Sequence, residues 1–275
     1  MRPHLARLTA LLVLLAAPAL LHAQSSRAES DADWIDRCER DSGDWDRARA
    51  CEVRNVPVRL SGRAISIDGK RNGGIRVFGW DGDSVRVTAR IQVQDRTEAG
   101  AKALLSRIRV TADGRNVRAD GPSTHGDGEG WSVGYVVYVP RRFDLDLEAH
   151  NGGLSVTSVA GKLALRTQNG SLAISDVGGD VHARTQNGSL TVQLTGKSWD
   201  GAGLEAVTQN GSVRLYVPEQ YAAQLETGTV NGSIRTDIPV TVQGRISKEL
   251  SIPLGGGGKT IRVRTTNGSV TIARR

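Results

Sequence analysis

Long stretches of the chain alternate between apolar and polar residues, which is typical of β-strands with one buried face. Residues 84–94 and 131–139 alternate in this way. Two further short apolar segments, at 108–110 and 117–119, flank an Asp-Gly turn. A turn of this kind between apolar segments predicts a β-hairpin. We therefore expect residues 56–140 to form a mainly β region.

One segment of this region has a helical period instead. Asp95 and Glu98 resemble a capping box, and the apolar residues that follow recur at helical spacing: Ala101, Leu104, Leu105 and Ile108. The pattern predicts a helix at about residues 96–108. No other segment of the mature chain predicts one.

From residue 141 to the C-terminus, residue 275, the alternation becomes a repeat built on Asn-Gly pairs. The asparagines are spaced by 18, 18, 23, 21 and 36 residues, at Asn151, Asn169, Asn187, Asn210, Asn231 and Asn267. From Asn169 on, a Thr stands two residues before each Asn, and apolar residues stand six before and three after. Each unit is therefore predicted to be a strand, an Asn-Gly turn and a second strand, with one apolar face.

Two architectures fit these units. Asn-Gly is the preferred pair for a tight hairpin turn, so the units could form a row of hairpins. Alternatively, each unit is one coil of a β-solenoid, in which identical side chains stack in ladders. The recurrence of the same Thr and Asn favours the solenoid. In both cases the glycine is expected to supply a positive φ. The 36-residue interval indicates either a coil without its Asn-Gly pair or a detour of the chain.

The repeat resembles a known bacterial family. The Asn-Gly-[Gly/Ser] units, the segment NGGIRVFGW at 72–80, LEAHNGGLSV at 147–156 and the lead-in CEVRNV at 51–56 are similar to members of the DUF4097 family. The resemblance covers roughly residues 51–275. It implies a β-solenoid-type repeat and an adhesin-like role, and it brings no catalytic residues with it.

The N-terminus predicts export. Residues 1–23 have a basic start, an apolar stretch at 8–21 and a cleavage site after Ala23, as in a secretory signal peptide. We expect no transmembrane span in the mature chain, which would be periplasmic, cell-surface or extracellular. Residues 24–55 contain the only two cysteines, Cys38 and Cys51. Thiols of exported proteins usually pair, so a structural disulfide is predicted; a zinc site lacks further ligands.

Composition narrows the function classes. The chain has 33 glycines and 4% aromatic residues, which suits a turn-rich β protein. Its net charge is +7, but the two signs alternate along the sequence, so a nucleic-acid partner is not expected. Five Asn-Gly-Ser turns match the glycosylation sequon, a match that the repeat already explains.

Few residues suggest chemistry. Asp144, Asp146 and Glu148 alternate with leucines, either as a solvated strand face or as paired carboxylates for glycoside cleavage. Asp81 and Asp83 are too few for a calcium site. Residues 255–260, GGGGKT, lack the first glycine of a phosphate-binding loop and lead into a strand. We expect no catalytic residue, metal or cofactor.

The predicted function is binding. We expect an exported, non-enzymatic, adhesin-like or envelope-associated β-solenoid whose partner is an envelope polysaccharide or a surface protein. Four arginines would present a basic face: Arg166, Arg184, Arg214 and Arg264. Trp199 would either stack on a sugar or pack against the fold. The alternatives are a polysaccharide-active enzyme on a β-helix scaffold and a self-assembling structural protein.

Overall fold

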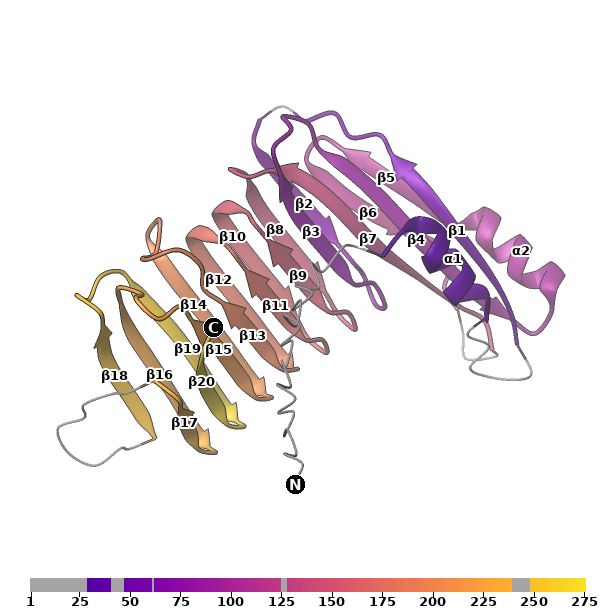
Figure 1. Cartoon of the computed structure of the whole chain (residues 1–275). Helices are drawn as coiled ribbons and strands as arrows, with labels where there is room; N and C mark the ends of the chain where they lie inside the picture. The colour runs from indigo at the N-terminus through magenta and orange to yellow at the C-terminus, as the bar shows by residue number, and fades with distance from the viewer. Residues whose placement is uncertain (1–28, 41–46, 61, 125–127, 239–247) are drawn as a thin grey trace, which may run out of the picture.

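The computed structural model describes residues 29–40, 47–60, 62–124, 128–238 and 248–275. Within these ranges the protein is mainly β, with two helices, α1 (Asp31–Arg40) and α2 (Glu98–Arg107). The strands form two ten-stranded mixed sheets that run side by side along an elongated, bent molecule (Figure 1). The predicted signal peptide, residues 1–23, lies outside the described residues.

The first sheet, here sheet A, contains β1 (Ala48–Val56), β3 (Ile75–Trp80), β4 (Arg86–Asp95), β7 (Gly130–Pro140), β9 (Leu154–Thr157), β11 (Leu172–Ser175), β13 (Leu190–Gln193), β15 (Val213–Val217), β17 (Ile234–Thr236) and β20 (Val270–Arg274). Its strand order is β1-β4-β7-β3-β9-β11-β13-β15-β20-β17.

The second sheet, here sheet B, contains β2 (Ala64–Asp68), β5 (Arg109–Asp113), β6 (Asn116–Asp120), β8 (Asp144–Ala149), β10 (Ala160–Thr167), β12 (Gly178–Asn187), β14 (Gly203–Asn210), β16 (Ala223–Asn231), β18 (Glu249–Leu254) and β19 (Thr260–Asn267). Its strand order is β18-β16-β19-β14-β12-β10-β8-β2-β6-β5.

Each repeat unit contributes one strand to each sheet, and neighbouring units pair in parallel. In β10 and β12, for example, Leu163 lies beside Val181 and Thr167 beside Thr185. The Asn-Gly turn joins a strand of sheet B to the following strand of sheet A. A hairpin would instead place the two strands of one turn antiparallel in the same sheet. The stacked arrangement is therefore confirmed, and the row of hairpins is wrong.

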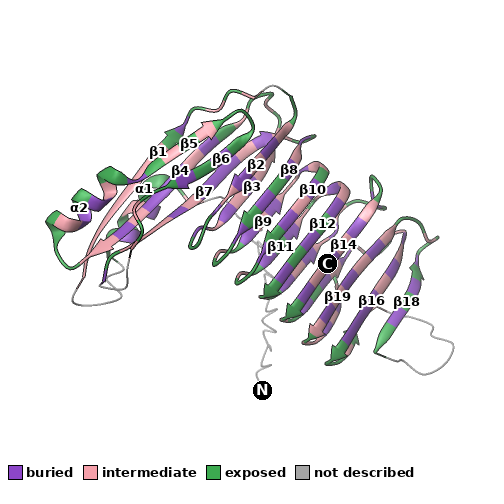
Figure 2. Ribbon diagram, turned by 180° about the vertical axis from the view of Figure 1, so that it is seen from behind, coloured by how far each residue is buried: buried purple, intermediate pink, exposed green. Residues whose placement is uncertain are grey.

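The hydrophobic core lies between the two sheets. Buried residues alternate with exposed or half-buried ones along the strands (Figure 2). The apolar position six residues before each repeat Asn is 0–3% exposed, at Leu163, Val181, Leu204, Leu225 and Ile261. Burying a side chain of this size stabilises the fold by about 1.5–3 kcal/mol. The period of two in the sequence thus corresponds to one buried face per strand.

The last unit of the chain is not the last unit of the stack. β19 pairs with β14 on one side and β16 on the other, and β20 lies between β15 and β17. After β17 the chain forms β18, which pairs antiparallel with β16 at the edge of sheet B, and then returns to fill the place between the two earlier units. The 36-residue interval is therefore a detour, and among the described strands each coil from β8 onward carries its Asn-Gly pair.

A similar detour occurs near the N-terminus. β2 and β3 flank Asn72 and stack directly on the next unit, β8 and β9. Between them in sequence the chain forms β4, α2, the predicted hairpin of β5 and β6, and β7. Both sheets therefore continue through residues 140 and 141, where we expected the repeat region to begin.

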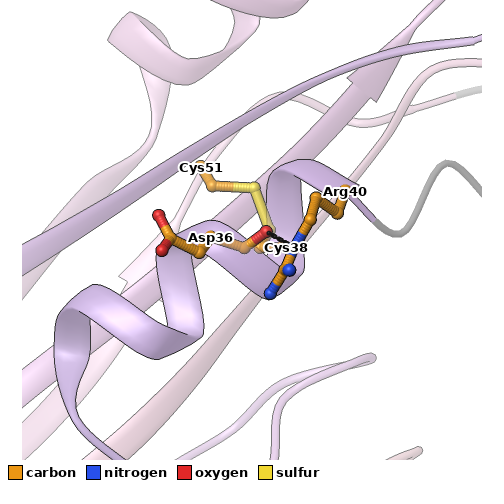
Figure 3. The surroundings of a disulfide bond; sticks show 4 residues. All are labelled: Asp36, Cys38, Arg40 and Cys51. Carbon is orange, nitrogen blue, oxygen red and sulfur yellow. Dashed lines mark hydrogen bonds between the residues drawn. A yellow bond between two sulfur atoms is a disulfide. The ribbon is translucent and has the colours of Figure 1, made fainter.

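The two helices differ in how well the sequence predicts them. α2 is confirmed, although its N-cap is Thr97, whose hydroxyl accepts from the backbone N–H of Gly100, rather than Asp95. The expectation of a single helix is wrong, because α1 is also present. α1 buries Trp34 and Cys38, which stand four residues apart on one face, so its apolar stripe is short. The predicted disulfide between Cys38 and Cys51 attaches it to β1 (Figure 3).

Candidate functional site: the outer face of sheet B

The Asn side chains of the repeat form one hydrogen-bonded ladder along the stack. Each amide Nδ2 donates to the Oδ1 of the next asparagine at 2.7–3.0 Å. In spatial order the ladder is Asn72, Asn151, Asn169, Asn187, Asn210, Asn267 and Asn231. The six predicted turn asparagines are therefore brought together, and Asn72 adds a rung that the sequence repeat did not include.

The buried Thr of each unit completes the turn of its neighbour. The Thr185 hydroxyl donates to the Gly170 carbonyl at 2.8 Å, and Thr167, Thr208, Thr229 and Thr265 make the corresponding bonds at 2.7–2.8 Å. These threonines are at most 6% exposed. A buried hydroxyl needs a partner, so the Thr column is structural.

The turn glycines are required for close approach rather than for a positive φ. Of the glycines in the predicted Asn-Gly pairs, only Gly268, at +155°, has a φ in the positive range. At Gly188, a Cβ atom would overlap the carbonyl oxygen of Gly170, and the other turn glycines have the equivalent conflict with the neighbouring unit. The expectation of a positive φ is therefore wrong for these glycines except Gly268. Glycine is required because the stacked backbones leave no space for a side chain.

Three of the four predicted arginines lie on the outer face of sheet B, and all three are near carboxylates. Arg166 Nη2 is 2.5 Å from Asp146 Oδ1, Arg184 Nη2 is 3.3 Å from Glu205 Oε2, and Arg264 Nη2 is 4.0 Å from Glu226 Oε2. Arg214 lies in β15 of sheet A. The four arginines therefore do not share one face, and those on sheet B are not an uncompensated basic patch.

His182 joins this network between two carboxylates. Its Nε2 is 3.1 Å from Asp180 Oδ1, and its Nδ1 is 3.3 Å from Glu205 Oε2. Burial raises the pKa of Glu205, but hydrogen bonds from His182 and Arg184 outweigh it and leave the pKa below its ordinary value. Glu205 is therefore held in its charged form.

A groove of about 920 Å³ crosses the outer face of sheet B beside this network. It runs across six adjacent strands, β2, β8, β10, β12, β14 and β19. At a strand spacing of ~4.8 Å, five spacings make the groove about 24 Å long. One wall carries Asp68, Glu148, Arg166, Arg184 and Val207. The groove is therefore shaped for an extended ligand that lies perpendicular to the strands.

The other wall of the groove carries three glutamines. Gln168, Gln186 and Gln209 each stand one residue before a ladder asparagine and are exposed. Their side chains make no hydrogen bond to any described residue. Sequence reasoning missed this row, although its signal, the recurring Thr-Gln-Asn, stood in the repeat. Sequence alone does not distinguish an outward polar residue that has a hydrogen-bond partner from one that has none.

The remaining candidates have structural partners. Trp199 is 6% exposed and its indole N–H donates to the Gly179 carbonyl at 3.0 Å, so neither ring face is free for a sugar. Asp81 forms an ion pair with Arg141, which holds the pKa of the Asp81 carboxyl below its ordinary value. Residues 255–259 form a loop between β18 and β19. No helix in the described ranges combines the length and apolar character needed to cross a membrane.

The fold and this face define a stacked-repeat β protein whose turns are held by side-chain ladders. The chain belongs to the DUF4097 family, whose model, described as Toastrack DUF4097, matches residues 135–273. The match begins in β7 and includes every predicted Asn-Gly unit. No curated protein matches the chain.

Several solved structures are similar over most of the chain. A candidate cell adhesion protein from Clostridium sporogenes has 8% identity and a TM-score of 0.44, covering 82% of this chain and all of that one (100%). A candidate adhesin from Bacteroides fragilis has 13% identity and a TM-score of 0.37, covering 82% and 97%. A candidate lipid-binding protein from Parabacteroides distasonis has 10% identity and a TM-score of 0.35, covering 82% and 96%.

Proposed function

We propose that this chain is an exported, non-enzymatic, adhesin-like β-solenoid of the cell envelope, which binds an extended partner along the groove of sheet B. The observation that carries this proposal is the groove itself, in which a row of exposed glutamines without protein partners faces a continuous trough across six strands.

Rigidity of the groove supports a binding role. Its floor includes Thr167, Thr185 and Thr208, whose hydroxyls are bonded to neighbouring turns. The asparagine ladder fixes the backbone immediately after each glutamine. A surface held in its binding geometry before the ligand arrives loses less conformational entropy on binding, which favours affinity.

Export is supported by the disulfide and the predicted signal peptide. The bond between Cys38 and Cys51 is of a kind that persists in oxidising compartments outside the cytosol. The basic and apolar pattern of residues 1–23 is what a secretory signal requires.

A non-enzymatic role is supported by the state of the carboxylates that could cleave glycosides. Asp146 is bound to Arg166, and the Asp144 Oδ1 accepts from the backbone N–H of Lys162 at 2.8 Å. Glu148 then has no free carboxylate beside it on β8 to complete an acid and base pair. We expect no hydrolysis of envelope polysaccharide, measured as the release of reducing ends.

A role as a monomer rather than a self-assembling fibre is supported by the edge strand β18. Lys248 O accepts from the backbone N–H of Thr229, and the alternating pattern of an antiparallel pair then directs the backbone of Glu249, Ser251 and Pro253 outward. Proline has no N–H to donate, so it hinders the addition of another strand there.

The test is binding of the mature chain, 24–275, to isolated envelope polysaccharide fractions at low and moderate salt. Val207→Trp would fill the groove without removing a polar group, and Arg214→Ala would alter the opposite sheet. We expect saturable binding to one fraction, lost in Val207→Trp and kept in Arg214→Ala. Absence of binding to every fraction, or unchanged binding by Val207→Trp, would show that the proposal is wrong.

A further inference from the structure

We infer that the groove takes an uncharged, unbranched polysaccharide laid across the strands, with one sugar residue per repeat unit, and that Gln168, Gln186 and Gln209 are its specificity-determining contacts. This inference rests on the proposed function of the same face and names the chemistry of its ligand.

The glutamine is the residue of the repeat that lines the groove with a polar side chain that has no partner among the described residues. In the segment RTQNGSL at 184–190, Arg184 is bound to Glu205, the Thr185 hydroxyl to Gly170, and the Asn187 amide to Asn169. Gly188 is required by close packing. Gln186 and Ser189 have polar side-chain groups without a partner among the described residues, and of the two only Gln186 lines the groove; the same holds for Gln168 and Gln209 beside Ser171 and Ser212.

Apart from Arg71, which has no ion-pair partner among the described residues, the Arg and Lys side chains of the groove are paired, and this pairing favours an uncharged ligand. Arg166 and Arg184 are bound to carboxylates, and Lys70 Nζ is 3.0 Å from Asp68 Oδ2. A polyanion would have to compete with these carboxylates and would also meet Glu148 on the same wall. An uncharged chain of hydroxyl groups disturbs none of these pairs.

The spacing of the glutamines favours a sugar chain over a peptide. Adjacent rungs are one strand spacing apart, ~4.8 Å, whereas an extended peptide advances ~3.3 Å per residue and drifts out of phase within two rungs. A 1→4-linked pyranose chain advances by about the length of one ring per residue, which is close to the strand spacing. Each amide offers two donors and one acceptor oxygen, and each hydroxyl can satisfy either kind.

The groove lining contains no Trp, Tyr or Phe, so the ligand cannot be held by stacking on a ring. Contact must come from hydroxyl groups on successive sugars, each weak by itself. Affinity is therefore expected to rise with oligosaccharide length up to about five residues, the number of strand spacings that the groove spans, and then to level off.

The test is calorimetric titration of the mature chain with cellopentaose, chitopentaose and mannopentaose, and with pentagalacturonate as the charged counterpart. We expect one uncharged pentasaccharide to bind with an affinity that is unchanged between about 0.05 and 0.5 M salt. The triple variant Gln168→Ala, Gln186→Ala, Gln209→Ala should bind at least about tenfold more weakly. Thr191→Ala with Arg214→Ala, on sheet A, should bind as the wild type does.

Three results would overturn the inference. Binding of pentagalacturonate alone, weakened by salt and by Arg166→Ala with Arg184→Ala, would make the ligand a polyanion and leave the proposed function intact. If the triple glutamine variant binds as tightly as the wild type, the glutamines do not contact the ligand. If no pentasaccharide binds, the inference fails, and the Val207→Trp assay on envelope fractions decides separately whether the face binds any partner.

Discussion

Substitution by alanine is expected to destabilise the fold at one residue of the repeat turn and to leave stability almost unchanged at the adjacent residue. Asn187 Nδ2 donates to Asn169, and its Oδ1 accepts from Asn210. Asn187→Ala removes both bonds at an exposed site, where water replaces part of them, so a loss of about 1–2 kcal/mol in the free energy of unfolding is expected. Gln186→Ala removes no intramolecular bond and should change it by less than about 0.5 kcal/mol.

Denaturant unfolding of the two variants measures this contrast directly. Equal stability losses would mean that Gln186 has a structural role, and the argument that it faces a ligand would then fail. The binding assay is the complementary measurement, since Gln186→Ala should affect binding while leaving unfolding unchanged.

The turn glycines give a second prediction at this scale. Gly188→Ala would place a methyl group against the Gly170 carbonyl, backbone that cannot move without separating two units. Overpacking of this kind should cost about 1–3 kcal/mol or more. Gly256 is the matched control, because a Cβ there meets nothing within 4 Å. If thermal unfolding shows equal effects of Gly188→Ala and Gly256→Ala, close packing is not the reason for glycine in the turn.

The sequence predicted the roles of residues that repeat and bond to their own copies. Asn recurs because each amide bonds to the Asn of the neighbouring unit, and Thr recurs because each hydroxyl bonds to a neighbouring turn carbonyl, so both form columns of identical residues in the sequence. The φ of the glycines was not predictable, since close approach of backbones and a positive φ select the same residue. The ion pairs of Arg166 and Arg184 were hidden because their partners, Asp146 and Glu205, belong to neighbouring units.

At the scale of elements, α1 shows how a helix with only a short apolar stripe, Trp34 and Cys38, is held. Arg90 is 4% exposed, and its guanidinium donates to the Glu29 carboxylate and main-chain carbonyl and to the Asp31 carboxylate. The Trp34 ring lies over the same guanidinium at 5.6 Å. These contacts, with the disulfide, join residues 29–40 to sheet A. No local pattern predicts these tertiary contacts. The helix itself has local signals, as α2 does, since the Ser30 hydroxyl accepts from the Asp33 backbone N–H and Trp34 and Cys38 are four residues apart.

Docking of α1 is expected to depend on pH. A hydrogen bond from Arg37, with the charges of Arg37, Arg90 and Arg76, lowers the pKa of Glu29 from its ordinary value of 4.5, against the effect of burial. A lowered carboxyl pKa gives stability that is present above 4.5 and is lost as the pH falls through the lowered value. The indole N–H resonance of Trp34 should therefore shift on acidification below that range.

Glu29→Gln is the control for this titration. It should weaken the docking of α1 by about 1–2 kcal/mol at neutral pH, because the charged hydrogen bond from Arg90 in β4 becomes a neutral one. At low pH, where Glu29 is protonated, the docking of α1 should be equally strong in the variant and in the wild type. If the Trp34 resonance of Glu29→Gln shows the same pH dependence as that of the wild type, another group is responsible for the pH dependence.

At the scale of the whole molecule, the order of the units in space could not be read from their order in the chain. From Asn169 on, the units carry the same Thr and Asn at the pairing positions, so β14 matches β19 as well as it matches β16. The only signal was the 36-residue interval, which is long enough for β18 and a return. Local patterns specify that units stack; they do not specify which units are neighbours.

In this arrangement the C-terminal unit, β19 and β20, connects the units on either side of it. β19 and β20 supply Ile261, Val263, Val270 and Ile272 to the core, each at most 1% exposed, and they pair with a unit on each side in both sheets. Deleting residues 260–275 removes the only strands that connect β16–β18 to the rest of either described sheet. We expect residues 223–236 and 249–254 to lose amide protection in hydrogen exchange, while residues 144–193 keep it because their parallel ladders are intact.

A matched variant separates this effect from a general loss of stability. Ile234→Ala shortens a half-buried side chain in β17, the last strand of sheet A, and should leave β16 protected through its pairing with β19. If the truncated chain keeps full protection at 223–236 and 249–254, β16 must have moved against β14, since the shared Thr and Asn columns permit that register. That outcome would show that the repeat sequence tolerates more than one order of units and that the C-terminal strands do not determine it.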